Sequence, residues 1–176
     1  MIFERITQDN IEFAIKVHSE LFPDFSAERN YVESFDGNHS YQYSLIMLEE
    51  KCIGIIGLYS YSQYPDSAWL GWFGIRKQYR RMKYGTQAIK EFEKTAVKKG
   101  FCFARLYTDK HNNDAAISFY RVNGYIEESY YNNDDPASAD HPIIIFSKPL
   151  LGQDPIPWNN KNIYLTEQIE KQKKQN

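Results

Sequence analysis

The stretch that most constrains the fold of this chain runs from Trp69 to Gly100. An apolar run, Trp69–Arg76, passes through a short loop into an amphipathic pattern that stops at Gly100. This order predicts a strand, a loop and a helix. Basic side chains crowd the loop: Arg76, Lys77, Arg80, Arg81 and Lys83. A helix start carries unpaired N–H groups and about half a positive charge, so the loop predicts a phosphate-binding site. A solvated basic loop is the plainer alternative.

Composition predicts a single globular domain without metal. The chain has 176 residues, of which 42% are hydrophobic and 25% charged. A net charge of −2 argues against nucleic-acid binding. No apolar run is long enough to span a membrane and the first residues do not resemble a signal peptide, so we expect a cytoplasmic protein. Cys52 and Cys102 form no disulfide framework, and the histidines match no metal-ligand spacing.

Strands are predicted where β-branched and aromatic residues gather in short runs. These runs are Met1–Ile6, Tyr41–Leu48, Cys52–Tyr61, Trp69–Arg76, Phe101–Thr108, Tyr125–Tyr131 and Pro142–Lys148. Trp69–Arg76 is almost continuously apolar, which predicts a central strand that is buried on both faces. Gly54 and Gly57 interrupt the third run, which indicates a bulge or close packing.

Helices are predicted where apolar residues recur at three- and four-residue spacing. They are Gln8–Leu21 capped by Thr7, a short helix from Ser26 to Gly37, the helix between Gly85 and Gly100, and Ala115–Asn123 capped by Asn113 and ended by Gly124. In the third helix Ala88, Ile89, Phe92 and Ala96 form one stripe. The composition changes after Pro149, so we expect a domain over residues 1–150 and an extension over 151–176, helical from Lys161 to Gln175.

Two motifs give the chain a family resemblance. The first, Arg80-Arg81-Met82-Lys83-Tyr84-Gly85, resembles the glycine-containing turn of the GNAT superfamily of acyl-CoA-dependent N-acetyltransferases, with Lys83 at the usual first glycine. The second is Asn113 followed by Ala116-Ile117, Phe119-Tyr120 and Gly124-Tyr125, in the family's order and spacing. The resemblance covers about Met1 to Leu150. It implies an α/β fold of the α+β type, a mixed, mostly antiparallel sheet of about seven strands with about four flanking helices.

The resemblance also implies an activity and a set of site residues. The enzyme would transfer an acetyl group from acetyl-CoA to a primary amine, expected to be that of a small molecule. The backbone from Arg80 through Thr86 would hold the pyrophosphate of the coenzyme, and Lys83 would either pair with a phosphate or hinder the close approach that a glycine allows. In the family the pantetheine arm inserts between splayed strands. It would contact the main chain of Phe73, Gly74 and Ile75 and the side chain of Asn113, whose plainer role is a helix cap.

Tyr120 would be the acid that faces the leaving sulfur and would contact the coenzyme, whereas its plainer role is packing. The oxyanion would be held by an amide near Phe73–Ile75. The base is not visible, because the strand Trp69–Ile75 has no carboxylate where many family members carry Glu. Water, or a side chain from the loops, stays open as the base: Asp109, His111 or His141.

The acceptor is expected between the first two helices and the final hairpin. An acidic segment there either is solvated or attracts a cationic amine: Glu127, Glu128, Asp134, Asp135 and Asp140. His18 is expected as a packed or pocket-edge residue rather than a ligand. Two alternatives to a small-molecule enzyme stay open, a non-catalytic acyl-CoA-binding module and a protein N-acetyltransferase that docks through its tail. We expect no nucleic-acid or membrane partner, and the sequence leaves a homodimer open.

Overall fold

A computed structural model describes residues 1–35, 41–111, 113–130, 142–161 and 163. Its strands lie in the order β1-β2-β3-β4-β5-β7-β6. Their bounds are β1 Ile2–Arg5, β2 Tyr41–Leu48, β3 Lys51–Tyr59, β4 Ser67–Ile75, β5 Phe103–Asp109, β6 Ile126–Ser129 and β7 Ile143–Pro149. The helices of the described part are α1 Ile11–Leu21, α2 Glu28–Glu33, α3 Tyr84–Lys98 and α4 Asp114–Val122, with a 3₁₀ turn, η1, at Lys77–Tyr79. The pairs β1–β2, β2–β3, β3–β4 and β6–β7 are antiparallel. This confirms the expected seven-stranded, mostly antiparallel α/β fold.

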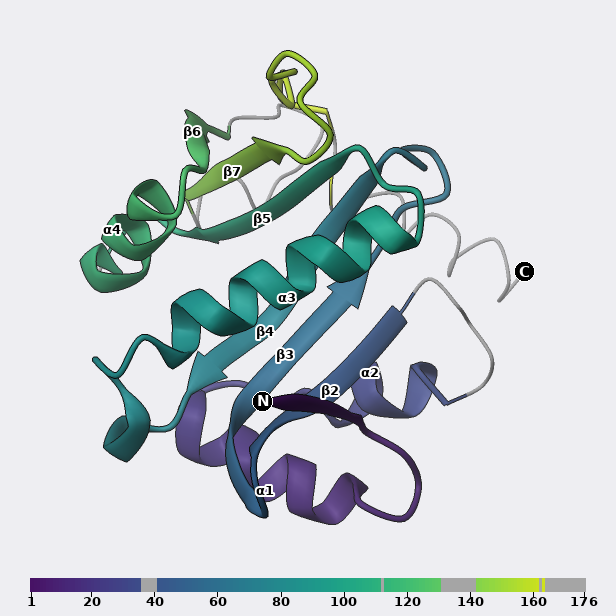
Figure 1. Ribbon diagram of the computed structural model, residues 1–176, viewed down its shortest axis with the longest axis vertical. Coiled ribbons are helices and arrows are strands. Elements are labelled where there is room, and N and C mark those ends of the chain that lie inside the picture. Colours follow the sequence, from purple (N-terminus) through teal and green to yellow (C-terminus); the bar gives the residue numbers. More distant parts are fainter. Residues whose placement is uncertain (36–40, 112, 131–141, 162, 164–176) are drawn as a thin grey trace. The chain divides into compact units, whose positions relative to one another are not determined.

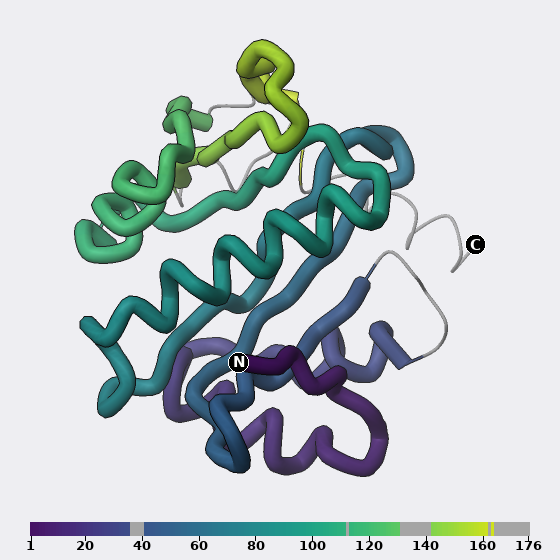
Figure 2. Tube along the Cα trace, in the orientation of Figure 1, coloured from purple at the N-terminus to yellow at the C-terminus, as the bar shows by residue number. Residues whose placement is uncertain are grey.

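The chain forms two compact units. The first comprises Met1–Ala104 and Leu150–Gln153, and the second comprises Arg105–Pro149 and the chain from Asp154 onward. In the first unit β1, the dark purple start of the tube in Figure 2, pairs with β2 at the edge of the sheet. Figure 1 shows α3 running along β3 and β4, with α1 and α2 near β2. No helix in the described ranges is long and apolar enough to cross a lipid bilayer.

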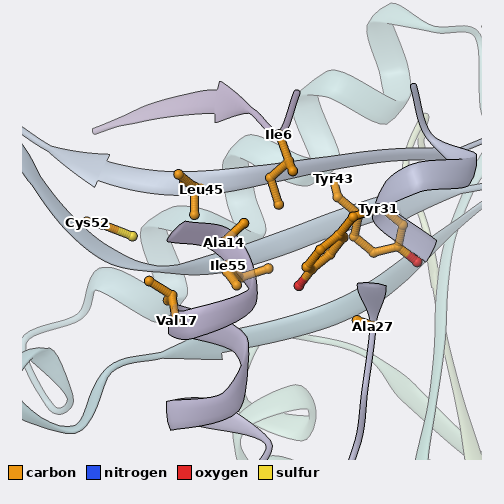
Figure 3. Packing of buried hydrophobic residues seen from close by; sticks show 9 residues of the cluster. All are labelled: Ile6, Ala14, Val17, Ala27, Tyr31, Tyr43, Leu45, Cys52 and Ile55. Atoms are coloured by element: carbon orange, nitrogen blue, oxygen red, sulfur yellow. The ribbon is translucent and has the colours of Figure 1, made fainter. Parts of the chain in front are cut away.

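The core of the first unit lies between α1, α2 and one face of β2 and β3. Ala14 and Val17 of α1 point toward Leu45 and Ile55 of these strands (Figure 3). The next residues along the strands, Ser44 and Ile56, line a small cavity with Phe92 of α3. Because neighbouring strand residues point to opposite faces, α3 covers the face away from α1. The predicted stripe of α3, which contains Phe92, is buried throughout.

Close backbone packing and two register shifts distinguish β3 and β4. A Cβ on Gly54 would lie 2.2 Å from the Gly74 carbonyl oxygen, which confirms the close packing expected at Gly54. The register shifts beside it, since Ile46 pairs with Gly54 and Met47 with Cys52. A second shift leaves Trp72 and Phe73 of β4 opposite the single residue Ile56. This is a β-bulge, and Trp72 has a φ of +34° there.

In the second unit β7 pairs with β6, and α4 packs its buried face through Ile117 and Tyr120. Trp158, which follows β7 in the chain, is also buried in this unit, since it is 1% exposed. The expected acidic positions Asp134, Asp135 and Asp140, with His141, lie outside the described residues, as do Gly37 and nearly all of the expected helix at 161–175.

Three local expectations differ from the structure. The first helix begins at Ile11 rather than Gln8, because Asn10 replaces Thr7 at its start and accepts a hydrogen bond from the Thr7 amide (2.8 Å). The cap of α2 is Ala27, not Ser26. Only the first half of β4 is buried, since residues 71–75 are half-exposed. The apolar run predicted burial of the whole strand, and the bulge at Trp72 falls where that burial ends.

Candidate functional site

The second half of β4 carries the main chain expected to contact the pantetheine arm. Gly74 and Ile75 pair with Ile55 and Gly54 of β3, so this part of the strand is held on that side. The end of α1 covers Gly74, where an added Cβ would lie 3.0 Å from the Phe22 ring. The half-exposed stretch Phe73–Ile75 is therefore held by β3 at Gly74 and Ile75.

The loop after β4 has the conformation of an anion-binding turn. Arg81 and Lys83 have φ values of +63° and +64°, and Lys83 is the N-cap of α3. The first backbone bond of that helix joins the Gln87 amide to the Lys83 carbonyl (3.0 Å), so the amides of residues 84–86 precede it. Left-handed residues just before a helix start turn successive N–H groups toward one point. Lys83 thus adopts the backbone conformation that a glycine would take most readily.

Two of the five basic side chains of this loop stabilise the fold itself. Arg76 donates to the Glu20 carboxylate (2.9 Å) and to the Cys52 carbonyl (3.2 Å). Arg80 Nε donates to the Ile75 carbonyl (2.8 Å), which ties the loop back to β4. The other three, Lys77, Arg81 and Lys83, are exposed and form no ion pair with the described residues. Since they flank the start of α3, the loop fits a polyphosphate such as that of coenzyme A.

In the second unit the Asn113–Tyr125 motif forms α4. Asn113 is the N-cap, and its carbonyl accepts from the amides of Ala116 and Ile117 (both 3.0 Å). Its side chain makes no capping bond and instead donates to Thr108 Oγ1. Asn113 therefore caps α4 through its backbone, and its amide side chain is oriented by β5.

Tyr120 is 8% exposed and packs against the rings of Phe119, Tyr125 and Phe146, with centroids 5.3–5.9 Å apart. Its hydroxyl makes no hydrogen bond to the described residues. Burial raises the pKa of Tyr120 well above its ordinary value of 10.0, so the phenol is protonated at neutral pH. The packing role and a proton-donating role are compatible, because the rings hold the phenol while its oxygen has no hydrogen-bond partner in the described part of the chain.

Of the remaining candidate site residues in the described part of the chain, two are exposed and two bind other groups of the protein. Asp109 and His111 are exposed at the end of β5. Glu127 accepts two hydrogen bonds from Arg121 (2.8 and 2.9 Å), which lowers the pKa of its carboxyl. Glu128 accepts from the backbone amides of Trp158 and Asn159. Both described glutamates of the acidic segment thus bind groups of their own unit.

The structure adds detail on His18, which the sequence predicted to be a packed or pocket-edge histidine. His18 is 2% exposed, and its Nδ1 shares a hydrogen bond of 2.9 Å with Tyr31 Oη. Its ring lies edge-on to Trp72 at the β4 bulge, with centroids 4.7 Å apart. The i, i+3, i+4 spacing of apolar residues in α1 predicted that His18 lies on a buried face. The contact between His18 and Trp72 could not be predicted, because no local sequence pattern marks the register shift at Trp72.

Comparison with known families decides the class of this protein. The family model described as "Acetyltransferase (GNAT) family" matches residues 5–125, which include the β4 bulge, the basic loop and the Asn113–Tyr125 motif. The chain belongs to the GNAT family of acetyltransferases. Its class is therefore that of the acetyl-CoA-dependent N-acetyltransferases, and the resemblance found in the two motifs is confirmed.

Solved structures of GNAT proteins share this fold. An aminoglycoside 6'-N-acetyltransferase complexed with coenzyme A aligns with a TM-score of 0.66 at 17% identity, over 88% of this chain and 99% of that one. The ribosomal-protein-S18-alanine N-acetyltransferase from Escherichia coli aligns with a TM-score of 0.66 at 16% identity, over 93% and 98%. A spermidine N-acetyltransferase chimera from Vibrio cholerae gives a TM-score of 0.67 at 13% identity, over 85% and 94%. A comparison with curated protein sequences found no significant match.

Proposed function

We propose that this GNAT enzyme transfers an acetyl group from acetyl-CoA to a primary amine of a small molecule in the cytoplasm. One observation carries the coenzyme part of the proposal. The loop before α3 presents left-handed residues at Arg81 and Lys83, the amides of residues 84–86 at the helix start, and three cations that form no ion pair with the described residues. Such a loop binds a pyrophosphate through its backbone and its charge together. Two GNAT enzymes with the same fold are named for small amine acceptors: one is an aminoglycoside acetyltransferase and the other a spermidine acetyltransferase.

The proposal gives each candidate residue a role. The backbone of Arg80–Thr86 binds the pyrophosphate, with Met82, Tyr84 and Gly85 contributing main-chain contacts. Phe73, Gly74 and Ile75 bind the amides of the pantetheine arm and, through one amide, the developing oxyanion. Asn113 contacts the pantetheine. When bound, acetyl-CoA supplies an acetyl group already activated as a thioester.

Tyr120 is proposed as the proton donor to the sulfur that leaves the acetyl group. Its raised pKa keeps the proton on the phenol at neutral pH, so a hydrogen bond is always available to that sulfur. The amine must lose its own proton before attack. An alkylamine with a pKa near 10.4 is mostly charged at pH 7, and neutralising it costs about 4–5 kcal/mol. We propose that water carries this proton away, since β4 has no carboxylate.

The test is release of free thiol from acetyl-CoA with a panel of amines. Tyr120→Phe should lower kcat at least 100-fold without changing the affinity for CoA, because a positioned acid contributes about 10²–10⁴. The matched control is Tyr125→Phe, which removes a hydroxyl from the neighbouring ring and should leave kcat nearly unchanged. Mass spectrometry of a cell extract incubated with the enzyme and acetyl-CoA would identify the acceptor.

Two outcomes would contradict the proposal. Tight CoA binding without thiol release for any amine would indicate a non-catalytic acyl-CoA-binding module. Acetylation confined to proteins in the extract would indicate a protein N-acetyltransferase instead.

The proposed location in the cytoplasm agrees with the two free cysteines, Cys52 and Cys102, because thiols stay reduced there.

A further inference from the structure

Three aromatic side chains gather beside the β4 bulge in the first unit. Phe22 and Phe25, from the segment after α1, have ring centroids 5.2 and 5.8 Å from that of Trp72. Phe25 is 57% exposed, and Phe22 and Trp72 are partly exposed. We call these three residues the ring cluster. Contiguous exposed rings present an apolar surface that gains free energy when a ligand covers it.

Neighbouring side chains of the first unit hold Trp72 of the ring cluster in one orientation. Trp72 Nε1 donates to the side-chain oxygen of Asn30 (3.1 Å), and the His18 ring packs edge-on against the indole. The bond between His18 and Tyr31 fixes that imidazole in turn. Burial lowers the pKa of His18, so the ring is neutral at pH 7 and adds no positive charge behind Trp72. The indole is thus oriented before any ligand arrives, which reduces the entropy lost on binding.

The ring cluster lies next to the backbone that handles the acetyl group in the proposed function. Trp72 directly precedes Phe73–Ile75 in β4. Phe22 contributes to the ring cluster and also covers Gly74, where an added Cβ would lie 3.0 Å from its ring. A molecule stacked on Trp72 is therefore within a few ångströms of this backbone, since successive Cα atoms are about 3.8 Å apart.

The described residues beside the ring cluster offer few carboxylates to a polycation: Asp24, which is exposed between Phe22 and Phe25 in the chain, and Glu28. A cavity of about 60 Å³ beside the ring cluster is lined by His18, Phe25 and Tyr31, and Glu28 is the one carboxylate among its described lining residues. A polyamine or aminoglycoside needs several free carboxylates to replace its hydration.

We propose that the ring cluster is the acceptor-selecting surface and that it favours a primary amine with an aromatic or extended apolar group over a polycationic amine. The inference rests on the proposed function and assigns its substrate class. The ring of the acceptor stacks on Trp72 and Phe25, and its amino group extends toward Phe73–Ile75.

Tryptophan fluorescence tests the binding step without relying on turnover. Trp69 and Trp158 are 0% and 1% exposed, so Trp72 is the tryptophan that a ligand can reach. CoA-loaded protein is titrated with 2-phenylethylamine, n-butylamine and spermidine, and kcat/KM is measured for each with acetyl-CoA. We expect 2-phenylethylamine to change the fluorescence at about tenfold lower concentration than spermidine, with about tenfold higher kcat/KM. Trp72→Phe should abolish the fluorescence change.

Two matched phenylalanine variants distinguish a loss of substrate preference from a general loss of activity. Phe25→Ala should reduce the preference for 2-phenylethylamine about tenfold, mainly through KM, with unchanged CoA affinity. Phe13→Ala removes a similarly exposed ring (46%) outside the ring cluster and should leave the preference unchanged.

Equal or tighter binding of spermidine would overturn the inference, as would equal losses in the two variants. Failure of the proposed function has a different signature. In that case the amines change the fluorescence of Trp72 in the expected order, but no amine causes thiol release.

Discussion

Lys83 holds a left-handed backbone conformation, with φ of +64° and ψ of +4°, at the N-cap of α3. A residue with a side chain loses about 1–2 kcal/mol in this region relative to glycine. Arg81, with φ of +63°, bears a similar cost two residues earlier. In return, the loop places two cations beside the helix start, where the helix dipole already favours an anion. The loop therefore combines a glycine-like backbone with side-chain charge.

Replacing Lys83 separates these two contributions. Lys83→Gly should leave the free energy of unfolding unchanged or raise it by up to about 1 kcal/mol, because strain is relieved while unfolded-state entropy increases. CoA affinity should fall about three- to tenfold, and less at high salt, because one cation is lost. Lys83→Val should destabilise the protein by about 1–2 kcal/mol, since a β-branched residue tolerates positive φ poorly. Urea denaturation measures the free energy of unfolding, and calorimetric titration measures the affinity for CoA.

Lys77→Val is the control, because Lys77 is an exposed cation of the same loop that is not among the positive-φ residues. Equal destabilisation by the two valine variants would show that backbone strain at Lys83 is not the cause.

At the level of elements, the described segment from Asp154 to Lys161 is built into the second unit. Arg105, which is 2% exposed, donates to Ser147 Oγ (2.6 Å) and to the Ile156 carbonyl (3.0 Å). Its guanidinium lies 5.3 Å from the centre of the Trp158 ring. Glu128 of β6 accepts from the backbone of the same segment. Side chains of β5, β6 and β7 thus fix the chain around Trp158, and we propose that this part of the 151–176 extension is required for folding.

Trp158→Ala should lower the free energy of unfolding by about 3–5 kcal/mol, the usual loss for removing a large buried ring. Ile156→Ala should change it by less than about 0.5 kcal/mol, because that side chain is 49% exposed and its carbonyl is kept. Urea denaturation of both variants measures the difference. A chain ending at Gly152 that kept the full stability would contradict a folding role for the segment.

At the scale of the whole molecule, each unit buries titratable groups in an uncharged state. Burial raises the pKa values of Tyr31 and Tyr120 well above 10.0 and lowers that of His18 below 6.5. The uncharged forms favour folding in every case, because ionisation would place a charge in an apolar environment. Burial also raises the pKa of the Cys52 thiol above 9.0. Stability should therefore have a plateau between about pH 6.5 and 9 and fall on both sides of it.

Above pH 10 the unfolded chain loses tyrosine protons that the folded chain keeps, so stability falls by about 1.4 kcal/mol per pH unit for each buried tyrosine. Below pH 6.5 the unfolded chain binds a proton at His18 that the folded chain does not, and stability falls again. Urea midpoints from pH 5 to 11 would show both limbs. Tyr120→Phe should remove about half of the tyrosine contribution to the alkaline slope, because Tyr31 remains, and His18→Gln should flatten the acidic limb. Slopes that stay unchanged in both variants would disprove the burial argument.

Local sequence patterns were sufficient to predict many of the helices and strands. The stripe of α3 is predictable because Ala88, Ile89, Phe92 and Ala96 follow the helical period, and all four are buried. Gly100 and Gly124, predicted to end helices, have φ values of +87° and +84°. Helix starts were less predictable, as the replacement of Thr7 by Asn10 shows, because several residues near a helix start can supply the cap. The roles of the predicted site residues stay proposals.

The order of the elements, the basic loop and the family were predictable from the sequence, because residue type and spacing within a short segment are enough for these. Two features depended on the packed chain: the bulge at Trp72, and the Arg76–Glu20 pair, whose partners are 56 residues apart. Each of these depends on which distant backbone or side chain lies opposite. Register and long-range pairing are properties of the packed chain, and no local window of the sequence contains both partners.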